Sequence, residues 1–166
     1  MRLFIAIRFS REIENALMDA IEKMKLQGIG ANFTRRENLH LTLAFIGESD
    51  RAEDIKNIID SLDAHRFEMT VEGSGSFGDL YWAGIGENTE LEGLARDLCG
   101  RLRAAGFDIE RHRFTPHITL ARRVVGKKRP EITIARTAMT VGRISLMRSD
   151  RIDGRLCYRE VYGRDI

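Results

Sequence analysis

The chain has 166 residues, of which 43% are hydrophobic and 31% are charged. These values are typical of one globular domain with a sizeable core, and they exclude a disordered or fibrous chain. No apolar run approaches the roughly 18 residues that a membrane helix needs, and Cys99 and Cys157 follow no metal or redox spacing. We therefore expect one soluble, cytoplasmic domain over residues 1–166, without a membrane anchor or a disulfide framework.

The first half of the chain is predicted to contain two strands, each followed by a helix. Residues 1–9 are expected to form a strand, and Ser10 is a suitable cap for a helix that ends near Gly28, because apolar residues recur at helical spacing between them. A second strand around residues 39–45 and a second helix over residues 50–62 follow.

The second half repeats this order. Residues 67–71 and 80–85 are typical of strands separated by the glycine-rich turn GSGSFG, and Thr89 with Glu92 forms the pattern of a capping box for a third helix. A short strand is expected at residues 107–110, and further strands end the chain. We therefore expect an α+β fold of two pseudo-two-fold-related lobes, each an antiparallel sheet with helices packed on its outer face, with the catalytic cleft between them.

Two hexads of the sequence share four of their six letters. They are HLTLAF, which begins at His40, and HITLAR, which begins at His117. In a strand, residues i and i+2 point to the same face, so His40 with Thr42 and His117 with Thr119 would each form a polar pair. The apolar residues of each hexad would face the other way. This pattern predicts two strands that each pack one face on a core and leave a histidine and a threonine on the open face.

Two histidines brought together around one cleft are the arrangement that an acid–base catalyst needs. Imidazole has an unperturbed pKa of about 6.5, so it can take or give a proton at neutral pH. A single strand histidine is more often structural, and threonine is common in strands, so the interpretation depends on the duplication of the motif.

The motifs and their flanks resemble the 2H phosphoesterase superfamily, and within it the RNA 2′,3′-cyclic phosphodiesterases, also called 2′-5′ RNA ligases. The segments RLFIAI, ENLHLTLAFIGE and TPHITLAR carry the resemblance, which extends over essentially the whole chain. It implies that His40 and His117 are the catalytic pair and that Thr42, Thr119 and Arg122 bind the phosphate. Strict strand alternation would turn Arg122 to the wrong face, so a bulge or the strand end must turn it inward.

The resemblance also implies a reaction, the opening of a terminal 2′,3′-cyclic phosphate to a 2′-phosphomonoester, together with reversible 2′-5′ RNA ligase activity at the same site. His40 would protonate the 3′ oxygen and His117 would activate water, although the residues alone fix neither role. No cofactor and no metal are expected, because catalytic zinc usually takes three protein ligands and the motifs offer two histidines and neutral hydroxyls. The expected partner is RNA with a 2′,3′-cyclic phosphate end, and the protein is expected to be a monomer with no obligate protein partner.

Positive charge is concentrated around the second motif. From Arg111 to Arg129 there are seven Lys or Arg and no acid, so this basic segment carries +7 in a chain whose net charge is +2. It is predicted to form a rim that attracts RNA phosphates, although the run at residues 127–129 is by itself more typical of a solvated loop.

Three aromatic residues are candidates for stacking on a nucleobase, because unpaired bases are commonly held on aromatic faces: Phe45, Tyr81 and Trp82. Phe45 is opposite in parity to His40, so core packing is the favoured interpretation for this residue.

Two alternative functions stay open. A non-catalytic RNA-end-binding module would bind a phosphorylated end without turnover, but binding alone has no need of two titrating imidazoles. A cyclic phosphodiesterase that acts on a small nucleotide would use the same residues. The basic segment favours a longer RNA over the small nucleotide.

Overall fold

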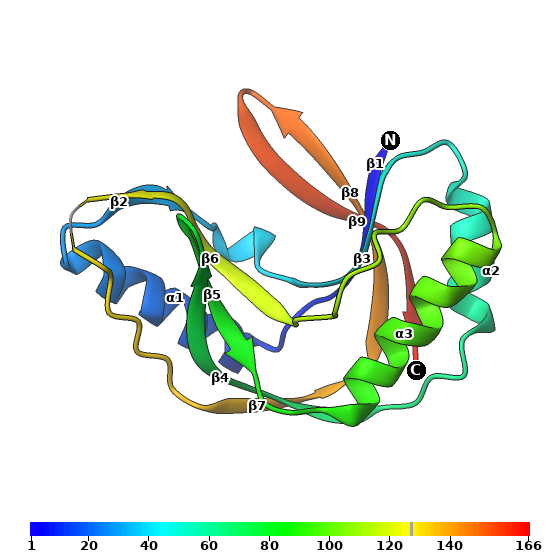
Figure 1. Cartoon of the computed structure of the whole chain (residues 1–166), viewed down its shortest axis with the longest axis horizontal. Coiled ribbons are helices and arrows are strands. Elements are labelled where there is room, and N and C mark those ends of the chain that lie inside the picture. Colours follow the sequence, from blue (N-terminus) through cyan, green and yellow to red (C-terminus); the bar gives the residue numbers. More distant parts are fainter. Residues whose placement is uncertain (127) are drawn as a thin grey trace.

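The computed structural model describes residues 1–126 and 128–166, and over these residues the chain forms two antiparallel sheets and three α-helices (Figure 1). The elements in chain order are β1 Arg2–Ile7, α1 Arg11–Leu26, β2 Gly30–Phe33, the 3₁₀ turn η1 Arg36–Asn38, β3 Leu41–Glu48, α2 Ala52–Ser61, β4 Phe67–Phe77, β5 Leu80–Ile85, α3 Thr89–Ala104, β6 His117–Val125, β7 Thr137–Val141, β8 Arg143–Ile152 and β9 Arg155–Asp165. In this part of the chain no helix is long and apolar enough to cross a membrane.

The two sheets define two lobes, as the sequence predicted. The first lobe has the strand order β3-β1-β8-β9 and is covered by α2 and α3, whereas the second has the order β2-β6-β5-β4-β7 and is covered by α1. Figure 1 shows the helices on the outer faces of the sheets, with the open side of each sheet turned toward the middle of the molecule. The α+β class and the two-lobed arrangement are therefore confirmed.

Each lobe has its own hydrophobic core, but the chain crosses between the lobes repeatedly. The helix α1 follows β1 of the first sheet and packs on the second sheet, whereas α3 follows β5 of the second sheet and packs beside β3 of the first. Phe9, Ile85 and Met139 contact both cores. Because each sheet is covered by a helix that leaves the other sheet, neither lobe could complete its core alone.

The glycine-rich segment differs from the prediction, because all of it except its last residue, Gly78, belongs to a strand. Strand β4 continues through it to Phe77, and the chain turns at Gly78, whose φ is +61°. Gly75 pairs with Trp82 of β5, and a Cβ on Gly75 would overlap the indole ring. The glycine therefore provides the space in which the Trp82 side chain crosses the neighbouring strand.

Two other local predictions were wrong. The cap of α3 is Asn88, whose side chain accepts a hydrogen bond from the amide of Leu91 at 2.9 Å, so Thr89 is the first helical residue. Residues 107–110 form a loop instead of a strand, and the Arg103 guanidinium donates hydrogen bonds to two carbonyls of this loop. Strand β2, which was not predicted, is only four residues long, so its alternation of Ala31 and Phe33 with Gly30 and Asn32 is too short to indicate a strand in the sequence.

The contact between Gly75 and Trp82 leads to a stability prediction. Gly75→Ala should destabilise the protein by about 1–3 kcal/mol, because the added methyl group overlaps the indole ring. Gly93→Ala is the matched control, since Gly93 lies in α3 with no atom within 4 Å of an added Cβ, and alanine there should stabilise by up to about 1 kcal/mol. Urea unfolding of the two variants measures both effects. Equal stability of the two variants would contradict the packing described here.

Candidate active site

The two motifs lie on the strands that face each other across the gap between the lobes. His40 immediately precedes β3 and Thr42 lies within it, whereas His117 and Thr119 both lie in β6. Strands β3 and β6 contact each other although they belong to different sheets. The leucines of β3 pack into the core of the first lobe, and Ile118 of β6 packs into the core of the second. The motif side chains are therefore left on the faces that line the cleft.

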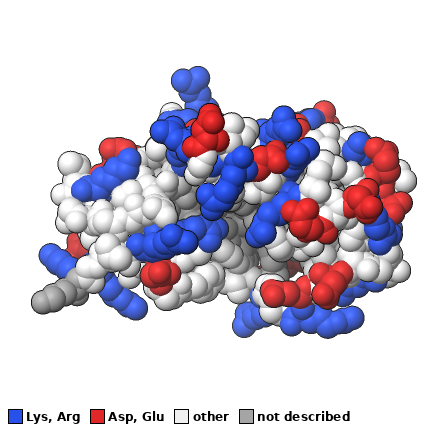
Figure 2. All heavy atoms as spheres, turned by 90° about the horizontal axis from the view of Figure 1, so that it is seen from above, with Lys and Arg blue, Asp and Glu red and all other residues white. Residues whose placement is uncertain are grey.

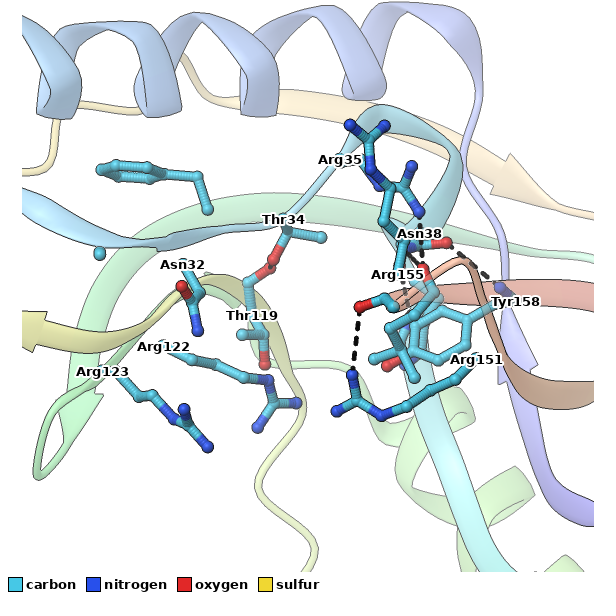
Figure 3. Close-up of a pocket in the computed structure, with 15 residues that line it drawn as sticks. Asn32, Thr34, Arg35, Asn38, Thr119, Arg122, Arg123, Arg151, Arg155 and Tyr158 are labelled. Atoms are coloured by element: carbon cyan, nitrogen blue, oxygen red, sulfur yellow. Dashed lines mark hydrogen bonds between the residues drawn. The ribbon is translucent and has the colours of Figure 1, made fainter.

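Two adjoining cavities show how the motifs combine. A cavity of about 620 Å³ is lined by His40 and Thr119, together with residues of β2 and of the β8–β9 hairpin (Figure 3). A second cavity of about 680 Å³ is lined by Thr42 and His117, together with residues of α3 and of the loop that precedes β6. Each cavity thus takes its histidine from one motif and its threonine from the other. The structure brings together the four residues that the sequence singled out.

Both histidines are held by the same local hydrogen bond. Nδ1 of His40 lies 2.7 Å from the carbonyl oxygen of Asn38, and Nδ1 of His117 lies 2.8 Å from the carbonyl oxygen of Thr115. A carbonyl can only accept, so each Nδ1 carries a proton and donates it. In the neutral imidazole Nε2 is then the unprotonated nitrogen, and Nε2 of His40 lies 3.0 Å from Oγ1 of Thr42. Each histidine therefore keeps one nitrogen for proton transfer.

A pair of aromatic rings surrounds each histidine, and the sequence analysis missed most of them. His40 lies 4.8 Å from Phe4 and 5.1 Å from Tyr158, measured between ring centroids. His117 lies 5.0 Å from Phe77 and 6.3 Å from Trp82. Only Trp82 was a candidate from the sequence, because all four rings lie far from both motifs in the chain and the fold brings them to the histidines. These contacts restrict the rotation of both imidazole rings.

The surroundings of His40 disfavour its charged form. Burial is the largest cause and lowers the pKa of His40 below its usual value of 6.5, while the hydrogen bond to Asn38 raises it in part. The positive charges of Arg122, His117 and Arg8 lower the pKa of His40 further. In the free protein His40 therefore releases its proton more readily than an exposed histidine does.

Arg122 reaches the cleft through a β-bulge. In the pairing of β5 with β6, Trp82 lies opposite Thr119 and Tyr81 lies opposite Ala121, so Leu120 is an extra residue. The bulge reverses the alternation and places Arg122 beside Thr119 on the wall of the first cavity. This confirms that an irregularity of the strand turns Arg122 inward. Its contact with a phosphate stays a prediction.

The expectation that Phe45 packs in the core was wrong, because its side chain is 51% exposed. Ala6 of β1 pairs with Thr42 and Ile5 pairs with Ala44, so a bulge at Leu43 reverses the alternation in β3. Phe45 consequently lines the second cavity.

The other two aromatic candidates lie on opposite faces of β5. Trp82 faces His117, whereas Tyr81 packs against the core beneath α1. The sheet therefore separates Tyr81 from the motif residues, which corrects the expectation that Tyr81 contacts a base. Nucleobase contacts by Phe45 and Trp82 stay predictions.

The basic segment does not form one rim, because its members are distributed along β6 and the loops at its two ends. Arg113 lines the second cavity, whereas Arg122 and the adjacent Arg123 line the first. Lys127 lies outside the described residues. Figure 2 shows lysine and arginine side chains around the hollow on the cleft face.

Asn38 connects the first motif to strand β9. Its side-chain nitrogen donates to the carbonyl oxygen of Leu156 at 2.9 Å, and its side-chain oxygen accepts from the amide of Tyr158 at 3.3 Å. The residue is only 8% exposed, and its own carbonyl holds His40. The side-chain amide of Asn38 thus pairs with β9 as a neighbouring strand would. This pairing fixes the backbone carbonyl of Asn38, which orients His40.

The fold, the paired motifs and the cleft define a two-lobed phosphoesterase. Residues 9–153 match the 2′-5′ RNA ligase superfamily, and the chain belongs to this superfamily. It is 36% identical over 132 residues to a Thermotoga maritima protein named RNA 2′,3′-cyclic phosphodiesterase, an alignment that covers 74% of this chain and 70% of the relative. An Archaeoglobus fulgidus protein of the same name is 29% identical over 142 residues, covering 80% of this chain and 77% of the relative.

Solved structures agree with this assignment. The crystal structure of Escherichia coli LigT complexed with 3′-AMP superposes with a TM-score of 0.86 at 25% identity, covering 99% of this chain and 97% of that chain. The Thermus thermophilus protein TT0787 superposes with a TM-score of 0.85 at 27% identity and with the same coverage. The two-lobed architecture is therefore shared over nearly the full length.

The role of Asn38 leads to a prediction that needs no enzyme assay. Asn38→Ala should lower the free energy of unfolding by about 1–3 kcal/mol, because it leaves the amide of Tyr158 without its acceptor and removes one of the two donors to the carbonyl of Leu156. It should also loosen the Nδ1 hydrogen bond of His40 while that of His117 stays intact. Long-range ¹H–¹⁵N spectra of the imidazole nitrogens measure this difference.

Gln27 offers a matched control. Its side-chain amide pairs in the same two-point way with the backbone of Glu131. Gln27→Ala should therefore leave the spectra of both histidines unchanged. If the two variants disturbed His40 equally, Asn38 would have no specific positioning role.

Proposed function

We propose that this protein opens the 2′,3′-cyclic phosphate at an RNA end and leaves a 2′-phosphomonoester, using two histidines as acid and base. The observation that carries the proposal is the convergence of His40, Thr42, His117 and Thr119 on one cleft, with the Nδ1 of each histidine held by a carbonyl. The names of the Thermotoga and Archaeoglobus relatives support the same substrate class.

The reaction requires two proton transfers on opposite sides of phosphorus. Water attacks phosphorus in line with the bond to the 3′ oxygen, and His117 takes a proton from this water at Nε2. The bond to the 3′ oxygen breaks, and His40 gives that oxygen the proton from its own Nε2. The two histidines then exchange their protonation states through solvent before the next turnover. This assignment of acid and base follows the resemblance to the 2H phosphoesterases.

The phosphate itself assists the acid. Burial and nearby cations lower the pKa of His40 in the free protein, so its proton is weakly held before substrate binds. A bound anionic phosphate next to the ring favours the imidazolium and raises the pKa again. His40 is thus charged when the leaving oxygen needs its proton.

Three donors near the histidines are suited to the charge that develops on the phosphate oxygens. The hydroxyls of Thr42 and Thr119 can donate hydrogen bonds, and the Arg122 guanidinium can add a charge-assisted one. Such donors stabilise the transition state most when they are in place before reaction. The bulge in β6 holds Arg122 in this position.

Removing the histidines tests the proposal directly. His40→Ala and His117→Ala should each lower turnover of a 2′,3′-cyclic phosphate by on the order of 10²- to 10⁴-fold. The double variant should fall well short of the product of the two effects, because the pair acts as a unit. Near wild-type turnover by either folded single variant would remove that histidine from the mechanism. Binding of the RNA end without any wild-type turnover would favour the non-catalytic binding module.

The pH profile tests the paired roles. The profile of kcat/KM should be bell-shaped, because the base must be neutral and the acid charged. The pKa of His40 is lowered in the free protein, so the descending limb of kcat/KM should lie at lower pH than the descending limb of kcat, which reports the substrate complex. The limbs belong to the coupled pair rather than to one residue. A flat profile between about pH 5 and 9, with chemistry rate-limiting, would contradict acid–base catalysis by histidine.

Catalysis without a metal is part of the proposal. Among residues 1–126 and 128–166 there is no group of three or more His, Cys, Asp or Glu side chains placed to hold a metal ion. Turnover should therefore survive EDTA. Loss of turnover on chelation, with recovery on adding zinc or magnesium, would require a different mechanism. Ligation would use the same residues, with a 5′-hydroxyl end in place of water as the nucleophile that opens the cyclic phosphate and the 3′ oxygen as the leaving group.

A further inference from the structure

The cavity that contains His40 is strongly cationic. Besides Arg122 it is lined by Arg35, Arg123, Arg151 and Arg155, and among the described residues no aspartate or glutamate lines it. Its volume of about 620 Å³ lies in the range of pockets that hold a ligand of nucleotide size. One cyclic phosphate needs few of these donors, so the cavity has more positive charge than the reaction uses.

Most of these arginines have no anionic partner within the described part of the chain. Arg35 is engaged, since it donates to the carbonyl oxygen of Leu156 at 2.7 Å and pairs with Glu37. The side chains of Arg122, Arg123 and Arg155 make no hydrogen bond or salt bridge among the described residues, and Arg151 makes only a long one, of 3.4 Å, to a carbonyl oxygen. Figure 3 shows the guanidinium groups of Arg122 and Arg151 pointing toward each other.

The carboxylates of the β8–β9 hairpin do not neutralise this charge. Asp150 is paired with Arg148 and Arg159, and Glu160 is paired with Arg143. Asp153 of the hairpin turn does not line the cavity and forms no salt bridge with an arginine among the described residues. Like charges that converge without a counterion repel each other, and an anion placed between them relieves the repulsion. The arrangement is therefore suited to a ligand that brings negative charge.

The backbone directs two neighbouring arginines into the cavity. Arg123 has a φ of +54°, a conformation that few residues other than glycine adopt. Successive residues of a regular strand would point to opposite faces, but both Arg122 and Arg123 line the cavity. Such strain is found where the surrounding structure maintains it, often at binding sites.

The other two arginines are carried by the end of the β8–β9 hairpin. Strand β1 pairs with β8 only as far as Ser149, whereas β8 and β9 stay paired to Ile152 and Arg155. The end of the hairpin therefore extends beyond the sheet, and Figure 1 shows it standing above the gap between the lobes. The Asn38 side chain holds the backbone of β9 just behind the hairpin end. Arg151 pairs with Leu156 and Arg155 pairs with Ile152, so the two arginines leave opposite faces of the hairpin, and at its end both line the cavity.

We propose that Arg123, Arg151 and Arg155 form a second anion site, which binds the phosphate on the 5′ side of the terminal ribose. The inference rests on the proposed function, because it takes the cyclic phosphate beside His40 as its reference point. In RNA the ribose that carries the cyclic phosphate is joined to the next nucleotide through its 5′ oxygen, so a second phosphate lies one nucleotide away. Arginine is suited to this phosphate because its planar guanidinium can form two parallel hydrogen bonds.

Two sources can supply a phosphate at this position. One is the phosphodiester of an RNA chain, and the other is a 5′-phosphomonoester on a single nucleotide. Three substrates separate them: cytidine 2′,3′-cyclic phosphate, its 5′-phosphorylated form, and the dinucleotide CpC with a 2′,3′-cyclic phosphate end. The dinucleotide should have a kcat/KM on the order of tenfold or more above that of the unphosphorylated mononucleotide.

The test compares two double variants of equal charge change. Arg151→Gln/Arg155→Gln should remove most of the preference for the dinucleotide, mainly through KM, and should weaken its dependence on salt. Arg136→Gln/Arg159→Gln is the control, because both residues are exposed, pair with carboxylates and do not line the cavity. This control variant should keep the preference for the dinucleotide.

The outcomes distinguish this inference from the proposed function. If kcat/KM rises equally for the 5′-phosphorylated mononucleotide and for the dinucleotide, relative to the unphosphorylated mononucleotide, the result supports a site for one phosphate of either source. If kcat/KM rises for the dinucleotide alone, the result supports a phosphodiester site. Equal kcat/KM for all three substrates in the wild type overturns the second site, as does an unchanged preference in Arg151→Gln/Arg155→Gln. Absence of turnover with every cyclic phosphate would instead overturn the proposed function.

Discussion

Strands β3 and β6 must each bury one face in a hydrophobic core and keep the other face polar, and the arrangement of the site depends on this requirement. Each strand carries a histidine and a threonine on its polar face, and Leu41 or Ile118 lies on the buried one. Two separate cores are needed, because both polar faces must line the same cleft. The two lobes provide these cores on the outer sides of the strands.

The exchange of helices between the lobes keeps the two motifs at a fixed distance from each other. Because α1 and α3 each cover the sheet that they did not leave, a change in the distance between the lobes would disturb both cores. Tightly packed cores resist such displacement. The histidines can therefore be placed on different sheets and still act on one substrate, as the proposed reaction requires.

The parts of the site that could be predicted from the sequence are those set by local alternation. Because successive side chains of a strand point to opposite faces, the sequence predicted His40 with Thr42 and His117 with Thr119 on open faces. It also predicted their apolar neighbours in the cores. The same rule failed at Phe45, because a bulge adds one residue and no local signal in the sequence marks it. For Arg122 the expected bulge was found, because the prediction came from the conflict between strand parity and the resemblance.

Other parts of the site could not be predicted because they depend on long-range contacts. Asn38 meets β9 across 118 residues of sequence, and Tyr158 packs on His40 across a similar separation. Arg151 and Arg155 lie outside the basic segment, and only the fold of the hairpin brings them to the cavity. Conversely, the charge of the basic segment was visible in the sequence, but its distribution along β6 was not.

The central claim is that the cleft delivers a proton to the 3′ oxygen while water attacks phosphorus from the opposite side. Phosphorus-31 NMR of the product from a nucleoside 2′,3′-cyclic phosphate tests this most directly, because the 2′- and 3′-monoesters give separate resonances. We predict that the 2′-monoester accumulates alone in the wild type and at a rate reduced on the order of 10²-fold or more in His40→Ala. A 3′-monoester, or a mixture of the two, would contradict the orientation of the substrate between His40 and His117.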